Sequence, residues 1–271
     1  MKTTLNYKIR GLTYWARCLN PFRDTVYCDG LPLGLQMRSY KRDAVGRGIY
    51  RRKLHERGVT EFLLARFPKG GDYNFIDVGA NIGYFSLLMS RLAGAKGRVL
   101  AIEPEPQNQR LLQENIRLNS LTNVAIHSCA LGAQAGTATL GLYKHSNRGR
   151  HSILNTNANS NIDVSVRTLY EVSQTDGADV SRWSLIKIDV EGYEGFVIEG
   201  AQAMLPQVDA IVMEFSPAAS RAAGKSPAST LDILASNFST MHRLENSGLT
   251  KVTARECCAT EAQMDLVFTR D

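Results

Sequence analysis

From residue 73 onwards, short apolar runs alternate with segments whose apolar residues recur at helical spacing. The runs predict strands at 74–78, 98–102, 123–127, 185–190, 210–215, 241–244 and 265–268. The helical spacing predicts helices at 84–92, 107–119, 193–204 and 230–236. Strands that alternate with helices are typical of βαβ units, and near-continuous apolar strands fit a parallel sheet buried on both faces. We therefore expect an α/β fold with helices on both faces of the sheet.

The regular pattern is interrupted between residues 132 and 182. Segments 136–143 and 162–166 alternate apolar and polar residues, and a polar stretch at 144–161 separates them. This predicts an inserted β-hairpin, before the strand at 185–190, with a long polar loop. Within that loop His151 is a candidate general base, and Arg148 and Arg150 are candidates for gripping an acidic acceptor. A solvated loop histidine remains the alternative. Three further histidines have no partner pattern and are interpreted as structural: His55, His127 and His242.

The first 70 residues differ in charge from the rest of the chain. They hold 15 Lys and Arg against 5 Asp and Glu, whereas the whole chain has a net charge of only +6. We expect residues 1–70 to form a basic extension that packs on a domain at 71–271. Two interpretations of this charge remain: a solvated basic face, and peripheral contact with an anionic membrane. A loose apolar stripe on a short helix is expected to pack on the domain, with membrane contact as the alternative: Leu5, Ile9, Leu12, Tyr14, Trp15 and Leu19.

The apolar runs and the cysteines of the sequence indicate in which cellular compartment the protein acts. The apolar runs span only a few residues, far below the ~20 that a membrane-spanning helix needs. The N-terminus has positive charge without the apolar stretch of a secretory signal. The 5 cysteines include no Cys-x-x-Cys pair, which disfavours a zinc site. We expect a cytoplasmic protein with reduced thiols.

A glycine-containing turn, Asp77-Val78-Gly79-Ala80-Asn81-Ile82-Gly83, joins the first predicted strand to a helix. Glycine lets the backbone approach a ligand closely, and a helix N-terminus offers free N–H groups. Glu103 ends the next strand, where a carboxylate can accept hydrogen bonds from both hydroxyls of a ribose. The combination predicts an adenosine-type ligand.

The same turn departs from the dinucleotide fingerprint. Asn81 stands where that fingerprint has its second glycine, and its side chain disfavours a pyrophosphate pressed onto the backbone. Asp77 would repel a pyrophosphate but would attract an ammonium group. Both residues favour S-adenosylmethionine over a nicotinamide dinucleotide.

Four segments resemble FkbM-type methyltransferases: residues 75–86, 102–104, 186–194 and 213–215. The resemblance runs from about residue 40 to the C-terminus and is most specific in the first and third segments. It implies a class I methyltransferase (Rossmann-like) fold, with a seven-stranded, mostly parallel sheet whose last strand is antiparallel. It also implies methylation dependent on S-adenosylmethionine, usually of a hydroxyl on a sugar or secondary metabolite.

The resemblance also implies roles for particular residues. Asp77, Gly79, Asn81 and Gly83 would border the methionine portion of the cofactor, and Glu103 would hold its ribose. The segment after the third strand would lie along the adenine: Ser128, Cys129 and Ala130. A plain buried cysteine is an equal interpretation of Cys129.

Acidic residues follow the fourth and fifth predicted strands. Asp189, Glu191 and Glu214 stand where parallel strand ends converge on a ligand crevice. A hydroxyl is a poor nucleophile, so a base must take its proton or a metal must lower its pKa. Asp189 or Glu191 is the candidate base, and Glu214 would orient the acceptor. Asp189 and Glu214 could instead bind Mg²⁺. Capping of the following helix is the alternative for Glu191 and the preferred interpretation of Glu194.

We therefore expect O-methylation of a hydroxyl on a sugar, glycan or secondary metabolite, with carboxylate-assisted or metal-assisted deprotonation. One alternative is a nucleic-acid methyltransferase. It is disfavoured because Asp189-Val190-Glu191-Gly192 replaces the (Asp/Asn)-Pro-Pro-aromatic stretch of many amino-methylating enzymes, and its carboxylates would repel phosphates. Another is a binding module that keeps the cofactor without catalysis. The sequence carries no signal for an oligomeric state.

Overall fold

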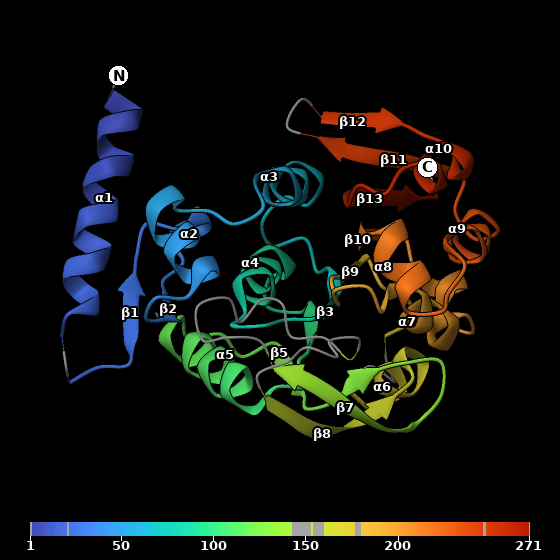
Figure 1. Cartoon of the computed structure of the whole chain (residues 1–271), viewed down its shortest axis with the longest axis horizontal. Coiled ribbons are helices and arrows are strands. Elements are labelled where there is room, and N and C mark those ends of the chain that lie inside the picture. Colours follow the sequence, from blue (N-terminus) through green and yellow to red (C-terminus); the bar gives the residue numbers. More distant parts are fainter. Residues whose placement is uncertain are drawn as a thin grey trace.

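An eight-stranded sheet forms the centre of the computed structural model, which describes residues 2–20, 22–142, 153, 160–176, 180–245 and 248–270 (Figure 1). Its strand order is β12-β11-β13-β10-β9-β3-β4-β5. The strands are β3 (Asn74–Val78), β4 (Arg98–Ile102), β5 (Val124–His127), β9 (Leu185–Ile188), β10 (Ala210–Phe215), β11 (Thr240–Glu245), β12 (Gly248–Lys251) and β13 (Met264–Thr269). The sheet is parallel from β5 to β10, and β13 pairs antiparallel with β10.

The expected class I sheet with an antiparallel last strand is confirmed, with one strand more than the predicted seven. The additional strand, β12, forms an edge hairpin with β11, and all four of its residues are exposed. A strand with no buried face leaves no apolar alternation in the sequence, which explains why the pattern did not predict it.

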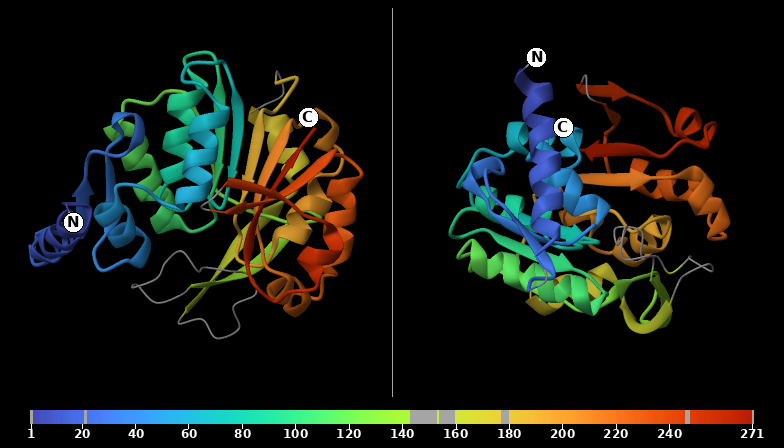
Figure 2. Two further views of the ribbon diagram at one scale, coloured as in Figure 1. Left: turned by 90° about the horizontal axis from the view of Figure 1, so that it is seen from above. Right: turned by 60° about the vertical axis from the view of Figure 1, so that its left-hand side comes forward.

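Helices cover both faces of the sheet, as Figures 1 and 2 show. The core helices are α4 (Tyr84–Ala93), α5 (Pro106–Leu118), α6 (Leu169–Asp176), α7 (Glu194–Ala201), α8 (Pro217–Ala222), α9 (Pro227–Ala235) and α10 (Ala254–Cys258). Successive strand residues point to opposite faces, so Phe75 packs with α4 and α5 while Ile76 packs with α6, α7 and α9. Both are fully buried, and this two-sided burial explains the continuous apolar strands.

The expected insertion before β9 is a three-stranded sheet. Strands β7 (Gly136–Leu142) and β8 (Ser160–Arg167) pair antiparallel, and β6 (Ala130–Leu131) pairs parallel with β8. Its apolar residues form a small cluster of their own, around Leu140 and Val164. The insertion is therefore built beside the main sheet, close to where β5 ends.

The N-terminal residues share the core of the main sheet. Their elements are α1 (Lys2–Cys18), β1 (Thr25–Cys28), the 3-10 turn η1 (Pro32–Gly34), β2 (Met37–Tyr40), α2 (Ala44–Arg52) and α3 (Arg57–Arg66). Met37 and Leu63 are fully buried in the same cluster as Phe75. The Asn115 side chain on α5 bonds both backbone groups of Arg38, which ties β2 to this layer. A domain boundary at residue 70 stays a prediction.

The apolar stripe of the first helix faces the opposite way from our expectation. Tyr14 is buried, but Ile9, Leu12, Trp15 and Leu19 are exposed. The inner face of α1 is instead formed by small and aromatic residues that approach α2. Periodicity predicted the helix but could not indicate which of its faces packs. Within the described residues, no helix combines the length and apolarity needed to cross a bilayer.

Candidate active site

A cavity lies at the C-terminal ends of β3, β4 and β9, with about 910 Å³ of empty space that is partly open to solvent. The chain places β4 and β5 on one side of β3 and then returns to place β9 on the other side. The strand order therefore reverses at β3. Open α/β sheets bind ligands at such a reversal. Residues from α2, the start of α3 and the inserted sheet complete the wall, including Val45, Glu56 and Leu140.

The turn after β3 forms one side of this cavity. Gly79 has a φ of 80°, and a Cβ there would lie 1.9 Å from the carbonyl oxygen of Asp189, so only glycine fits. Asn81 also takes a left-handed conformation, with a φ of 51°. Both residues line the cavity, in agreement with their expected place.

Glu103 is held in place by backbone donors. Its Oε2 accepts from the N–H of Asn81 at 2.8 Å, and its Oε1 accepts from the N–H of Glu105 at 2.9 Å. Burial raises the pKa of Glu103 to about 7, although these two N–H groups favour the charged form. The carboxyl lines the cavity with its orientation fixed; Oε1 also accepts from the Asn108 side-chain amide at 3.5 Å, and Oε2 keeps a lone pair for another donor.

Of the three residues expected along an adenine, two line the cavity. Cys129 and Ala130 do, and Cys129 also belongs to the hydrophobic core, as a plain buried cysteine would; its contact with an adenine stays a prediction. Ser128 is exposed outside the cavity and donates to Oε1 of Gln109 at 2.8 Å. A ligand contact for its side chain stays a prediction.

Asp77 and Gly83 lie behind the cavity wall. Asp77 is buried among β3 and α4, where its Oδ2 accepts from the Ser86 hydroxyl at 2.5 Å and its Oδ1 has no hydrogen-bond partner. Burial raises the pKa of this carboxyl, partly opposed by the charge of Lys187. A Cβ on Gly83 would lie 2.4 Å from Leu112, so this glycine permits helix packing. Both residues support the turn from behind.

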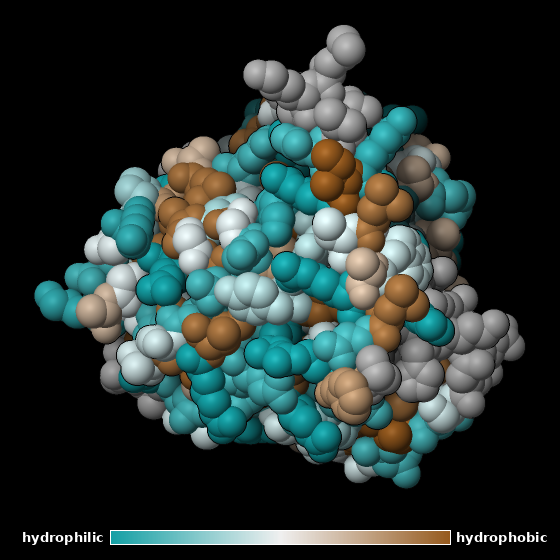
Figure 3. Space-filling model, turned by 90° about the vertical axis from the view of Figure 1, so that its left-hand side faces the viewer, coloured by the Kyte–Doolittle hydropathy of each residue, from teal (hydrophilic) through white to brown (hydrophobic). Residues whose placement is uncertain are grey.

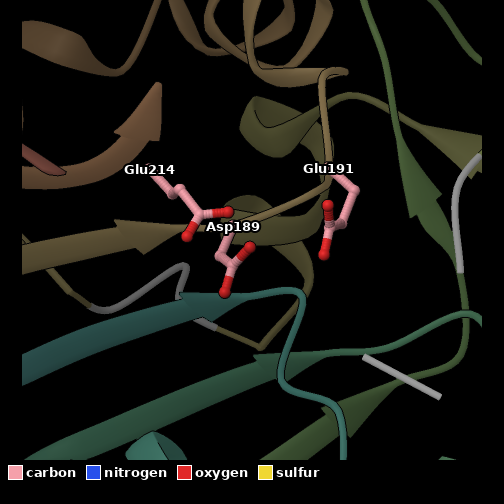
Figure 4. Close-up of side chains that lie close together, drawn as sticks. All are labelled: Asp189, Glu191 and Glu214. Atoms are coloured by element: carbon pink, nitrogen blue, oxygen red, sulfur yellow. The ribbon is translucent and has the colours of Figure 1, made fainter. Parts of the chain in front are cut away.

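Three carboxylates meet where β9 and β10 end (Figure 4). One oxygen from each of Asp189, Glu191 and Glu214 lies within 4.8 Å of the others, the sole grouping of this kind among the described residues. Asp189 and Glu191 line the cavity. Glu191 has a φ of 53°, a backbone conformation that non-glycine residues adopt rarely and that clusters at functional sites.

Glu214 is the member of this group with a strongly raised pKa. Burial, followed by the negative charge of Asp189, raises the pKa of Glu214 to about 9. This side chain therefore carries its proton near neutral pH and can donate a hydrogen bond. Glu194, by contrast, accepts from the N–H groups of Gly192 and Val190 at 2.9 and 3.3 Å. Glu194 thus orders the turn before α7 (Glu194–Ala201) and makes no cap hydrogen bond to that helix, which corrects its helix-capping interpretation.

Lys187 is a site residue that the sequence analysis missed. Its Nζ lies 3.0 Å from Oδ2 of Asp189 and 3.8 Å from Oε2 of Glu56, and its side chain is 4% exposed. Burial alone would lower the pKa of Lys187, but the surrounding carboxylates, led by Asp189 and Glu56, keep it above its usual value. A charged residue inside the apolar strand β9 was the signal that could have revealed it.

His55 lines the cavity, a position that the sequence analysis did not predict. Its Nε2 lies 3.0 Å from Oε1 of Glu56, and its Nδ1 is buried with no hydrogen-bond partner. The pKa of Glu56 would rise through burial, but Lys187 and then His55 lower it to about 2. The basic extension therefore supplies two polar side chains to the site. Of the other predicted site residues, His151 lies outside the described residues, as do Arg148 and Arg150.

The family model "Methyltransferase FkbM domain" matches residues 77–243. "Methyltransferase 1" of Beauveria bassiana (strain ARSEF 2860) is 30% identical over 154 residues, covering 51% of this chain and 61% of that protein. "Methyltransferase sdnD" of Sordaria araneosa is 31% identical over 154 residues, covering 46% of this chain and 59% of that protein. The chain thus matches about three fifths of the length of these curated relatives.

Among solved structures, the methyltransferase FkbM of Methylobacillus flagellatus KT is similar in fold. It is 17% identical, with a TM-score of 0.49, and the match covers 81% of this chain and 49% of that chain.

Proposed function

The chain belongs to the FkbM methyltransferase family, and from this premise we propose that it transfers a methyl group from S-adenosylmethionine to a hydroxyl oxygen. The proposed acceptors are sugars, glycans or secondary metabolites. The observation that carries the proposal is the single cavity that joins the ordered Glu103 carboxylate to the Asp189 and Glu191 carboxylates. A nucleoside and an acceptor can thus be held at two ends of one space.

The residues at one end of the cavity fit the cofactor. Glu103 would accept hydrogen bonds from the ribose hydroxyls, and because Asn81 and Glu105 already fix it, little ordering is needed on binding. Cys129 and Ala130 would pack along the adenine, and the turn containing Gly79 would border the methionine portion. When bound, the cofactor supplies an electrophilic methyl group on a sulfonium.

The carboxylates at the other end would handle the acceptor. Methyl transfer forms a C–O bond, breaks the C–S bond and releases the hydroxyl proton, so a nearby group must accept that proton. Glu214 already holds a proton near neutral pH, which leaves Asp189 and Glu191 as the acceptors of the proton. Glu214 would donate a hydrogen bond that orients the acceptor. Lys187 would position Asp189 through the 3.0 Å contact.

Metal-assisted deprotonation is a second candidate, favoured by the close approach of the three carboxylates. Mg²⁺ prefers oxygen ligands, and these residues would hold it. The Lys187 ammonium already binds Oδ2 of Asp189 and would compete with a metal for that carboxylate, so we favour the metal-free route. Retained turnover in excess EDTA, with no gain on adding Mg²⁺, is the result expected for that route.

The cofactor part of the proposal is tested by calorimetric titration with S-adenosylmethionine, S-adenosylhomocysteine and NADH. We expect the first two to bind, and a Glu103→Ala variant to bind them more weakly. Binding of NADH alone would overturn the proposal.

The catalytic part is tested with a labelled methyl donor and a panel of sugar, alcohol and phenol acceptors. Once an acceptor is found, Asp189→Asn should lower kcat by about 10²–10⁴-fold because a proton acceptor is lost, and Glu214→Ala should lower kcat because the orienting donor is lost, while both variants keep cofactor affinity. Glu61→Gln, at an exposed ion pair with Arg57, is the matched control. Wild-type rates in both site variants would remove the proposed roles.

We also propose that the protein acts in the cytoplasm. All five cysteines are free thiols, and Cys257 and Cys258 remain unpaired although adjacent. Free thiols persist in reducing compartments.

A further inference from the structure

Helix α1 carries two different apolar faces. Its inner face packs on α2 through the fully buried Tyr14, whose ring lies 5.5 Å from that of Tyr50, and through the buried Cys18. Its outer face carries Ile9, Leu12 and Trp15, and Leu19 follows directly after the helix ends at Cys18. Residues spaced three and four apart lie on one side of a helix, so these side chains form a continuous stripe. We call them the outer stripe.

The outer stripe is open to solvent. Leu12 is 73% exposed and Leu19 is 77% exposed, and Phe22, just past the helix, is 93% exposed. Figures 1 and 2 show α1 at the edge of the molecule, far from the C-terminal strands, and Figure 3 shows brown apolar side chains among teal ones on this side. Isolated exposed leucines are ordinary, but a row along one helix face marks an interaction surface.

The segment that carries the outer stripe is basic, and the exposed Asp24 follows directly after it. Residues 1–23 contain 5 Lys and Arg and no Asp or Glu. Lys8 and Arg23 are exposed, and the Arg47 guanidinium on α2 lies 5.8 Å from the centre of the Trp15 ring, whereas Arg17 turns to the inner side and donates to the Tyr27 carbonyl. An apolar stripe flanked by cations complements a surface that is apolar below and anionic above.

We propose that α1 lies flat on a membrane that carries anionic lipid, with the outer stripe buried among the acyl chains and the flanking cations at the headgroups. Helices that bind in the plane of the interface combine these features, and tryptophan favours that depth. A second copy of the chain would place the same cations against one another, which disfavours a dimer through this face. The inference does not depend on the proposed methyl transfer.

The experiment is co-sedimentation of the full chain with vesicles of phosphatidylcholine alone and of phosphatidylcholine with phosphatidylglycerol. We expect binding to the anionic vesicles, weakened by salt, and much weaker binding to the neutral ones. The double variant Leu12→Gln and Leu19→Gln should bind the anionic vesicles at least roughly tenfold more weakly, because two apolar side chains that would insert among the acyl chains are lost. Leu249→Gln, at an exposed leucine on the opposite edge, should bind as the wild type does.

The variants should retain wild-type thermal unfolding, since all three leucines are exposed. Three results would overturn the proposal. One is that neither vesicle binds the wild type. Another is that the double variant binds as the wild type does. The third is a wild-type dimer that the double variant converts to a monomer in analytical ultracentrifugation, which would assign the outer stripe to a second copy.

Discussion

Lys187 shows how one buried charge organises several residues. Its ammonium group interacts with Asp189, Glu56 and Asp77, which come from three separate segments of the chain. It also lies 4.6 Å from the centre of the Phe85 ring. Buried ion pairs gain little net stability over apolar substitutes, but losing one partner leaves an uncompensated charge. The role of Lys187 is therefore to lower the pKa of Glu56 and to hold the neighbouring carboxylates in place.

Replacement of this lysine should lower the stability of the fold by an amount that depends on pH. We expect Lys187→Met to lower the free energy of unfolding by about 3–5 kcal/mol at pH 8, where the carboxylates are left charged and buried. The loss should be smaller at pH 5, because carboxyls whose pKa rises without the lysine can take up protons. In the wild type, Lys187 and His55 keep the pKa of Glu56 near 2. Glu56 therefore stays charged at pH 5, and its interaction with Lys187 still stabilises the fold there. Urea unfolding at both pH values measures this, and an equal loss at both would point to packing instead.

Glu103 predicts a pH dependence of cofactor binding. Its pKa of about 7 lies above the usual value, so the charged form that accepts ribose hydroxyls is lost as pH falls through 7. Affinity for S-adenosylhomocysteine, whose own groups keep their charge between pH 6 and 8, should fall by up to about tenfold from pH 8 to pH 6. Calorimetry measures it. Glu103→Gln should bind weakly and equally at both pH values, and a flat wild-type profile would contradict the prediction.

At the scale of elements, the turn between β3 and α4 is the most constrained connection. It combines left-handed residues with contacts to β4 and β9, because Gly79 and Ala80 both donate to the carbonyl of Ile102 at 3.0 Å. The sequence predicted this turn well, since glycine and asparagine are the residues that such a backbone requires.

Gly79→Ala should disrupt this element. The new Cβ would collide with the Asp189 carbonyl and occupy an unfavourable φ, which we expect to cost at least about 1–3 kcal/mol and to weaken cofactor binding. Thermal unfolding and calorimetric titration provide the readouts. Gly136→Ala on β7 is the matched control, because no atom lies within 4 Å of its added Cβ. A similar fall in melting temperature for both variants would contradict the steric argument.

Other elements were less accessible to sequence reasoning. The apolar runs predicted β3, β4, β9 and β10 because each is buried on both faces. The orientation of α1 was harder to predict. Its outer stripe has the periodicity of a packed helix face, but only the side with Tyr14 packs on the protein. His55 and Glu56 could not be placed because α3 lies far along the chain from β9, and only the fold brings them together.

At the scale of the whole molecule, the N-terminal 70 residues and the sheet share one apolar layer. Tyr14, Met37 and Leu63 are fully buried in the same cluster as Phe75 and Leu87. Removing the N-terminal residues would expose Phe75 and Leu87 to water. Each Å² of apolar surface exposed in this way would lower the free energy of unfolding by roughly 25 cal/mol.

A chain beginning at residue 71 should therefore fail to fold cooperatively. We expect it to show no sharp thermal transition by circular dichroism and no binding of S-adenosylhomocysteine, whereas the full chain shows both. A cooperative transition with retained binding would instead establish residues 71–271 as an autonomous domain.

The chain has only two tryptophans, and the fold places them in opposite environments. Trp183 is 1% exposed in the core beside β9, while Trp15 is 44% exposed on α1. Their emission spectra should differ accordingly, with Trp183 blue-shifted and protected from iodide, and Trp15 red-shifted and quenched. With either residue replaced by phenylalanine, intrinsic fluorescence separates the two signals. The native chain thus contains one optical reporter of unfolding and another of whatever contacts its first helix, with no attached dye.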